Sequence, residues 1–214
     1  MTARIGERME RRGRFITLEG IDGAGKSSHV EFLRARAAER GIEVVVTREP
    51  GGTSFGAALR DVVLHHPATP LAEAIAMFAD RASHVEEVIE PALAAGRWVL
   101  CDRFSDSTYA YQCGGRGLDP AAVAALERLV HPVLQPDATF LFDLDPREAA
   151  ARQRSRSATA DKFEREQVDF FRRVREAYLE RARANSGRIR VIDASGDISA
   201  VRERLARAFD EALA

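Results

Sequence analysis

The segment GIDGAGKS at residues 20–27 constrains the fold of this chain more than any other feature. It follows the apolar run FITLE at 15–19 and precedes the helical stretch SHVEFLRARAAER at 28–40. The pattern G-x-x-x-x-G-K-S between a strand and a helix is typical of a loop that wraps phosphate groups. Glycines let backbone N–H groups approach phosphate oxygens, and the helix N-terminus adds about half a positive charge. The segment therefore predicts nucleoside triphosphate binding.

The residues of this loop have expected roles in binding ATP and Mg²⁺. The lysine side chain is expected to reach the β- and γ-phosphates and the serine hydroxyl that follows it to ligate Mg²⁺. Lys26 is one of only two lysines in the chain, and the other is Lys162. The residues expected to surround the ATP phosphates are Gly20, Gly23, Ala24, Gly25, Lys26, Ser27 and Ser28.

Short apolar runs alternate with longer helical stretches along the rest of the chain. The runs lie at 15–19, 42–47, 98–101, 139–144 and 190–192. Nearly continuous apolar runs are typical of parallel strands that are covered on both faces. The pattern predicts an α/β fold with a doubly wound, five-stranded parallel sheet and helices on both faces. No linker divides residues 14–214, which are expected to form one domain. The charged residues 1–13 are expected to be a flexible extension.

Charge and composition exclude several classes of protein. The net charge of −1 gives the chain as a whole no electrostatic reason to bind nucleic acid or an anionic membrane. No apolar stretch approaches the roughly 18 residues of a membrane-spanning helix, and no secretion signal is evident, which favours a cytoplasmic location. A regulatory GTPase needs an N-K-x-D sequence, and the chain contains no Asn-Lys pair.

Two further segments are candidates for phosphate chemistry. The run VLCDR places Asp102 and Arg103 at the carboxyl edge of the sheet, where open α/β folds bind ligands. Asp102 is a candidate for the Mg²⁺ hydration shell and Arg103 for phosphate binding, although an ordinary strand-end ion pair would have the same sequence. Residues 147–166 are rich in arginine, as are mobile phosphate-binding segments and ordinary solvated helix ends.

Taken together, the motifs resemble the bacterial thymidylate kinase family. The resemblance rests on LEGIDGAGKS, TREPGGT, ADRASHVEEVIEPAL, CDRFSDSTYAYQCGGRG, PDATFLFDLDP and DKFEREQVDFFRRVREAYLE, in this order from residue 18 to residue 180. It implies a P-loop kinase that transfers the γ-phosphoryl of ATP to dTMP, giving dTDP and ADP for dTTP synthesis. It also implies dependence on Mg²⁺ and a homodimer.

The same resemblance assigns residues to roles. It implies an acceptor site for dTMP made by Glu49, Pro50, Arg60, Met77, Phe78, Arg81, Arg103, Thr108, Tyr111 and Gln112. The bond between Glu49 and Pro50 is expected to be cis. Metal binding falls to Ser27 and Asp102. Catalytic roles fall to Lys26, Asp22, Arg103, Arg152 and Arg156, the last two in a lid at about 147–163 that also contains Lys162.

Two questions stay open within this interpretation. Any of the lid cations Arg152, Arg154, Arg156 or Lys162 would serve at the transition state. Relatives usually carry a phenylalanine that stacks on the base where this chain has Met77. Either Met77 covers the base, which we favour, or a shift in the helix brings Phe78 into the stack.

Competing functions make different predictions. A deoxynucleoside kinase, or a kinase for another nucleoside monophosphate, would share the loop and the D-R pair. Arg60, Arg81 and Arg103 favour an acceptor that already carries a phosphate. A nucleotide-dependent switch or partner-binding ATPase would hydrolyse ATP slowly without any acceptor and leaves the motifs at 101–117 unexplained.

Overall fold

The computed structural model describes residues 12–154 and 164–213. Most of the expected N-terminal extension and much of the expected lid lie outside these residues. In chain order, the elements are β1 (Phe15–Glu19), α1 (Ser27–Ala38), β2 (Val44–Arg48), α2 (Ser54–His65), α3 (Pro70–His84), η1 (Val85–Ile89), α4 (Glu90–Ala94), β3 (Trp98–Asp102), α5 (Ser105–Thr108), η2 (Tyr109–Gly115), α6 (Pro120–Val130), β4 (Ala138–Asp143), α7 (Pro146–Arg154), α8 (Glu164–Ala184), β5 (Ile189–Asp193) and α9 (Ile198–Leu213). The segments η1 and η2 are π-helical.

The sheet confirms the predicted fold class. Within the described residues it has five strands in the order β2-β3-β1-β4-β5, and every neighbouring pair is parallel. Each strand lies within two residues of the apolar run that predicted it. Because β1 is central, the loop after it emerges at the middle of the carboxyl edge, with the end of β3 beside it.

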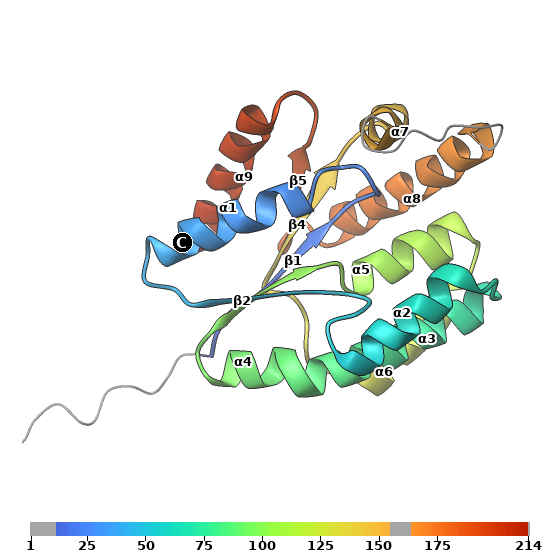
Figure 1. The fold of residues 1–214 in the computed structure, drawn as a ribbon, viewed down its shortest axis with the longest axis horizontal. Helices are drawn as coiled ribbons and strands as arrows, with labels where there is room; N and C mark the ends of the chain where they lie inside the picture. Colours follow the sequence, from blue (N-terminus) through green and yellow to red (C-terminus); the bar gives the residue numbers. More distant parts are fainter. Residues whose placement is uncertain (1–11, 155–163, 214) are drawn as a thin grey trace, which may run out of the picture.

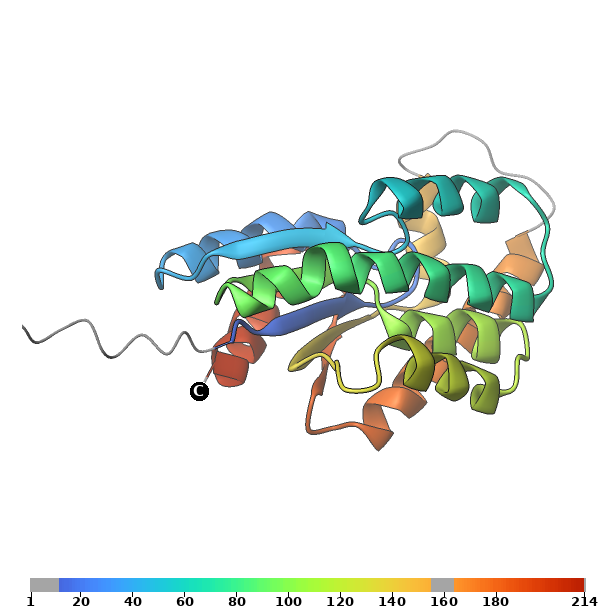
Figure 2. The same cartoon turned by 90° about the horizontal axis from the view of Figure 1, so that it is seen from below.

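Helices cover both faces of the sheet, as Figure 1 shows. Helices α1 and α9 lie on one face, and the continuous helical run α3-η1-α4 lies on the other, where Figure 2 shows it in front of the strands. Leu33 of α1 and Leu205 of α9 join a core cluster with Phe140 of β4. Leu93 of α4 joins a second cluster with Val99 of β3. Apolar side chains on both faces of the strands explain why the strand sequences do not alternate.

Several helices begin at capping residues that the sequence supplies. Thr53 precedes α2 and its hydroxyl accepts from the N–H of Gly56 at 3.0 Å. Thr69 caps α3 and Asp119 caps α6, each followed by a proline at the first helical position. A side-chain oxygen satisfies an otherwise unpaired N–H group, and proline has no N–H to satisfy at that position. These capping residues therefore define where α2, α3 and α6 begin.

Two other properties bear on the expectations from sequence. No helix among the described residues is long and apolar enough to cross a membrane. The backbone N–H of Gly13 donates to the carbonyl of Leu93 at 2.8 Å, so the chain already contacts α4 just before β1 begins.

Candidate functional site

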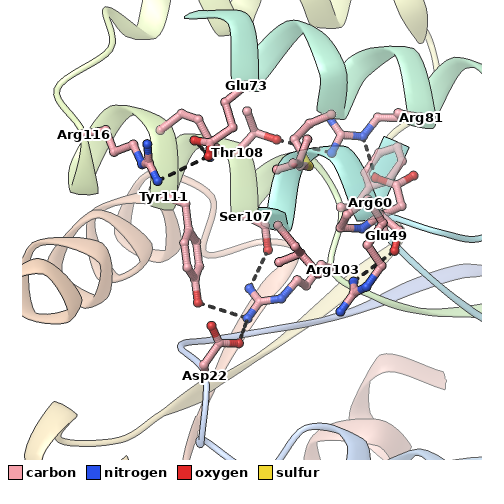
Figure 3. A pocket seen from close by; sticks show the side chains of 16 residues that line it. Asp22, Glu49, Arg60, Glu73, Arg81, Arg103, Ser107, Thr108, Tyr111 and Arg116 are labelled. Carbon is pink, nitrogen blue, oxygen red and sulfur yellow. Dashed lines mark hydrogen bonds and ion pairs between the residues drawn. The ribbon is translucent and has the colours of Figure 1, made fainter. Parts of the chain in front are cut away.

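A cavity of about 350 Å³ opens at the carboxyl edge of the sheet, beside the glycine-rich loop. All but one of the residues expected to bind the acceptor line it, and the exception is Phe78. Figure 3 shows Glu73, Thr108 and Arg116 at one end of the cavity and Asp22 with Arg103 at the other. The cavity therefore has one end near the phosphate loop and one end remote from it.

The loop between β1 and α1 has the backbone that its glycines predict. Gly20 and Gly23 have φ angles of +136° and +86°, a region that side chains disfavour. A Cβ atom would come within 2.5 Å of the Phe142 carbonyl oxygen at Gly20 and within 2.6 Å of the Ala149 carbonyl oxygen at Gly23. The loop thus needs glycine both for its conformation and for its close approach to β4 and α7.

The Lys26 side chain is folded back onto this loop. Its Nζ donates to the carbonyl oxygens of Gly20 at 2.9 Å and Ile21 at 3.2 Å. Burial, together with the nearby Arg103 guanidinium, lowers the pKa of Lys26 to about 8. A bound polyanion would raise this pKa again, because a nearby negative charge favours the charged amine. Lys26 is therefore placed to exchange carbonyl partners for phosphate oxygens.

Arg103 has an unusual backbone and many side-chain partners. Its φ of +75° is rare for a residue with a Cβ and costs about 1–3 kcal/mol. Its guanidinium donates to Asp22 at 2.7 Å, Tyr111 at 3.0 Å, Ser107 at 3.0 Å and Tyr178 at 3.2 Å. These bonds hold the guanidinium in the cavity wall between the phosphate loop and η2. Burial by itself would raise the pKa of Asp22, but the nearby Arg103 guanidinium outweighs this effect and lowers the pKa below its ordinary value.

A buried carboxylate lies behind this arginine. Glu19, the last residue of β1, is fully buried and accepts from the N–H of Phe104 at 2.7 Å. It also accepts from the hydroxyls of Ser107 at 2.6 Å and Tyr178 at 2.9 Å. Glu19 thereby fixes Phe104, the residue after Arg103. It also holds the Ser107 and Tyr178 hydroxyls, which accept hydrogen bonds from the Arg103 guanidinium. Glu19 was not among the residues expected from the sequence to form the site.

The wall formed by α3 carries a second buried arginine. Arg81 is 2% exposed and its Nε donates to Glu49 Oε2 at 2.8 Å. Glu49 Oε1 lies 2.8 Å from Nδ1 of His84, one helical turn behind Arg81. The Glu49–Pro50 bond is cis, as expected. The NH1 group of Arg81 has no hydrogen-bond partner among the described residues, so a donor remains for a ligand.

Met77 and Phe78 lie in different surroundings. Met77 lines the cavity, whereas Phe78 is 1% exposed and does not. The Phe78 ring stacks on His131 with centroids 5.9 Å apart, and the Arg81 guanidinium lies 4.4 Å above it. The two residues differ because they are about 100° apart around α3. Contact between Met77 and a bound base stays a prediction.

The expected metal ligands are Asp102 and Ser27. Asp102 Oδ1 is buried and has no hydrogen-bond partner among the described residues, and Ser27 is exposed at the first turn of α1. The described residues contain no group of three or more His, Cys, Asp or Glu side chains able to hold a metal alone. One carboxylate and one hydroxyl suit Mg²⁺, which keeps several waters and takes oxygens from substrate phosphates.

The expected lid residues are only partly placed. Arg152 of α7 donates to Glu148 at 2.7 Å and to the carbonyl oxygen of Gly196 at 3.2 Å. Arg156 and Lys162 lie outside the described residues. Sequence analysis missed other residues of the cavity wall, namely Val63, Leu64, Glu73, Phe104, Ser107 and Arg116. A helical signal existed for Glu73, which stands four residues before Met77 and eight before Arg81.

Comparison with known proteins points to one family. Residues 18–205 match the family model for thymidylate kinase. Thymidylate kinase of Bordetella pertussis is 54% identical over 197 residues, which cover 92% of this chain and 94% of that protein. Thymidylate kinase of Chromobacterium violaceum is 55% identical over 192 residues, covering 88% and 90%. The crystal structure of thymidylate kinase from Ehrlichia chaffeensis superimposes with a TM-score of 0.74 at 32% identity, covering 92% of this chain and 98% of that one.

Proposed function

Because the chain belongs to the thymidylate kinase family, which transfers the γ-phosphoryl of ATP to dTMP, we propose that its cavity is the dTMP site. The observation that carries this proposal is the convergence of Arg60, Arg81 and Arg103, from α2, α3 and the end of β3, on a single cavity. Two of these arginines, Arg60 and Arg103, suit an acceptor that already carries a phosphate. They count against a deoxynucleoside kinase, whose acceptor is uncharged.

The chemistry follows from the acceptor phosphate and the γ-phosphate of ATP. An oxygen of the acceptor phosphate attacks the γ-phosphorus of ATP, a new P–O bond forms, and the bond to the bridging oxygen breaks to release ADP. The attacking oxygen is already ionised near neutral pH, so no general base is required. Catalysis then depends on positioning and on cations around the transferred group. Lys26 supplies one such cation, and Arg152 and Arg156 of the expected lid are proposed to supply others.

The remaining residues of the cavity are proposed to hold dTMP. Arg60, whose NH1 donates to the carbonyl oxygen of Pro50 at 3.1 Å, is proposed to bind the acceptor phosphate with Arg103. Tyr111 is proposed to occupy the space that a ribose 2′-OH would need. Asp22 acts through Arg103, whose guanidinium it orients. Thr108 and Gln112, with Arg81, are proposed to bind the edge of the base, and Met77 its face.

Mg²⁺ belongs to this proposal as well. Asp102, through its unpartnered carboxylate oxygen, and Ser27 would hold the ion together with ATP oxygens and water. The bound ion would neutralise charge on the β- and γ-phosphates. A homodimer, which the family resemblance implies, and a cytoplasmic location, which the sequence favours, stay predictions. Sedimentation velocity of the purified protein would measure the first.

A coupled assay of ADP release tests the function. The wild-type protein is assayed with ATP and Mg²⁺ against dTMP, dUMP, dCMP, dAMP and thymidine. We expect dTMP to give the highest kcat/KM and dTDP to appear in equal amount to ADP. A preference for thymidine would support the deoxynucleoside kinase. ADP release that is equal with and without any acceptor would support a nucleotide-dependent ATPase.

A further inference from the structure

A buried acidic residue lies at the end of the cavity remote from the phosphate loop. Glu73 is 7% exposed and lines the cavity with Met77 and Arg81, at intervals of four residues along one side of α3. Figure 3 shows Arg116, Glu73, Thr108 and Arg81 along this wall. None of the roles assigned above uses Glu73, although burying a carboxylate is costly unless it is paired.

Both carboxylate oxygens of Glu73 have partners from the segment around η2. Oε2 accepts from the amide Nε2 of Gln112 at 3.0 Å, and Oε1 lies 3.3 Å from NH2 of Arg116. An ionised carboxylate can only accept hydrogen bonds. A Gln112 amide rotated by 180° would place its carbonyl oxygen against the carboxylate and lose the bond. Glu73 therefore fixes which end of the amide points toward it.

The fixed amide turns its carbonyl oxygen away from Glu73. One of the two N–H groups of Nε2 donates to Glu73, whereas Oε1 of Gln112 has no hydrogen-bond partner among the described residues. Arg81 offers the opposite polarity, because its NH1 is an unpartnered donor and a guanidinium cannot accept. Thr108 connects the two elements, since its hydroxyl accepts from Arg81 NH2 at 3.3 Å and it precedes Gln112 by one helical turn. This wall thus presents one hydrogen-bond acceptor, on Gln112, and one hydrogen-bond donor, on Arg81.

Pyrimidine bases differ in this pattern. Thymine and uracil carry an acceptor at O4 and a donor at N3–H, which match the free donor of Arg81 and the free acceptor of Gln112. Cytosine carries an amino donor at C4 and an acceptor at N3, so it would face like with like at both positions. A site built to hydrogen-bond one pattern strongly rejects the other because its polar groups are then left unpaired.

We propose that Glu73 is a specificity-determining positioning residue, which orients the Gln112 amide so that the site selects a base with N3–H and O4 over cytosine. The proposal rests on the dTMP site proposed above. Glu73 does not touch the reacting phosphates, so it acts on recognition of the base. The Glu73 oxygen that accepts the hydrogen bond, rather than the negative charge alone, sets the orientation of the Gln112 amide.

Two substitutions separate these properties. Glu73→Met keeps the length of the side chain and removes the acceptor, whereas Glu73→Gln keeps an acceptor oxygen and removes the charge. We expect the ratio of kcat/KM for dTMP to that for dCMP to fall at least tenfold in Glu73→Met and to stay within threefold of wild type in Glu73→Gln. In Glu73→Met the loss should appear as a higher KM for dTMP, with kcat within threefold.

A matched control and a second variant complete the experiment. Glu86→Met removes an exposed carboxylate from the same helical run and should leave the ratio unchanged. Glu73→Ala, read by the same ratio, replaces Glu73→Met if the thioether prevents folding. A ratio within threefold of wild type in the folded Met or Ala variant overturns the proposal, and so does an equal fall in Glu73→Gln. Failure of the proposed function is a separate result, because it would appear as wild-type protein that does not prefer dTMP.

Discussion

Glu19 gives a stability prediction whose size and sign follow from its surroundings. The side chain is fully buried, and burial, followed by the Asp106 carboxylate, raises the pKa of Glu19 to about 7 from the ordinary 4.5. In the substitution Glu19→Gln, the amide oxygen can still accept from the N–H of Phe104. The amide NH₂ can donate to the hydroxyl oxygen of Ser107 or Tyr178. The change therefore removes the titrating charge while the hydrogen bonds can be kept.

The sign follows from linkage between folding and proton binding. The raised pKa means that the folded state holds the proton of Glu19 more tightly than the unfolded state does. The stability that this gives wild type is fully present below pH 4.5 and is lost as the pH rises through 7. A shift from 4.5 to about 7 corresponds to roughly 3 kcal/mol, of which about 2 kcal/mol is lost above pH 5.5. The variant has no such loss.

Urea unfolding of both proteins between pH 5.5 and 8.5 measures this difference. The free energy of unfolding of Glu19→Gln, minus that of wild type, should rise by about 2 kcal/mol over this range and level off above pH 7. Exposed Glu87→Gln serves as the control and should show no such rise. A difference that is flat or falls with pH would refute the reasoning, because the carboxylate would then have an ordinary or lowered pKa in the folded protein.

Four other substitutions test the site and its support. Lys26→Ala should abolish transfer and leave the fold intact, and activity within threefold of wild type would contradict its role. Met77→Ala should mainly raise the KM for dTMP, whereas Phe78→Ala, which empties a fully buried position, should cost about 3–5 kcal/mol by chemical unfolding; a large KM effect confined to Phe78→Ala would reverse this assignment. Gly56→Ala would place a Cβ atom 1.8 Å from Asp80 Oδ1, so we expect about 1–3 kcal/mol of destabilisation, and an unchanged melting temperature would contradict it.

The side of the cavity formed by α3 shows how much of the site helical spacing alone could predict. Because α3 is regular between Pro70 and His84, positions four residues apart share a side, and the sequence could place Met77 with Arg81 and Phe78 away from them. The same spacing pointed to Glu73, but an acidic residue on a helix is usually solvated. Its bond to Gln112 crosses from α3 to η2, whose π-helical backbone no periodicity in the sequence signals.

The sequence by itself determined the sheet, the phosphate loop and the class of reaction. These features depend on consecutive residues, such as the apolar runs of the strands and the motif at 20–27, so local patterns encode them. Only the tertiary structure decided how Arg103 is held. Two of its partners, Ser107 and Tyr178, are held by Glu19, and Tyr178 lies 159 residues after Glu19 in the chain. Nothing local specifies such a pairing, because it exists only after α8 has packed against the end of β1 and excluded water from the carboxylate.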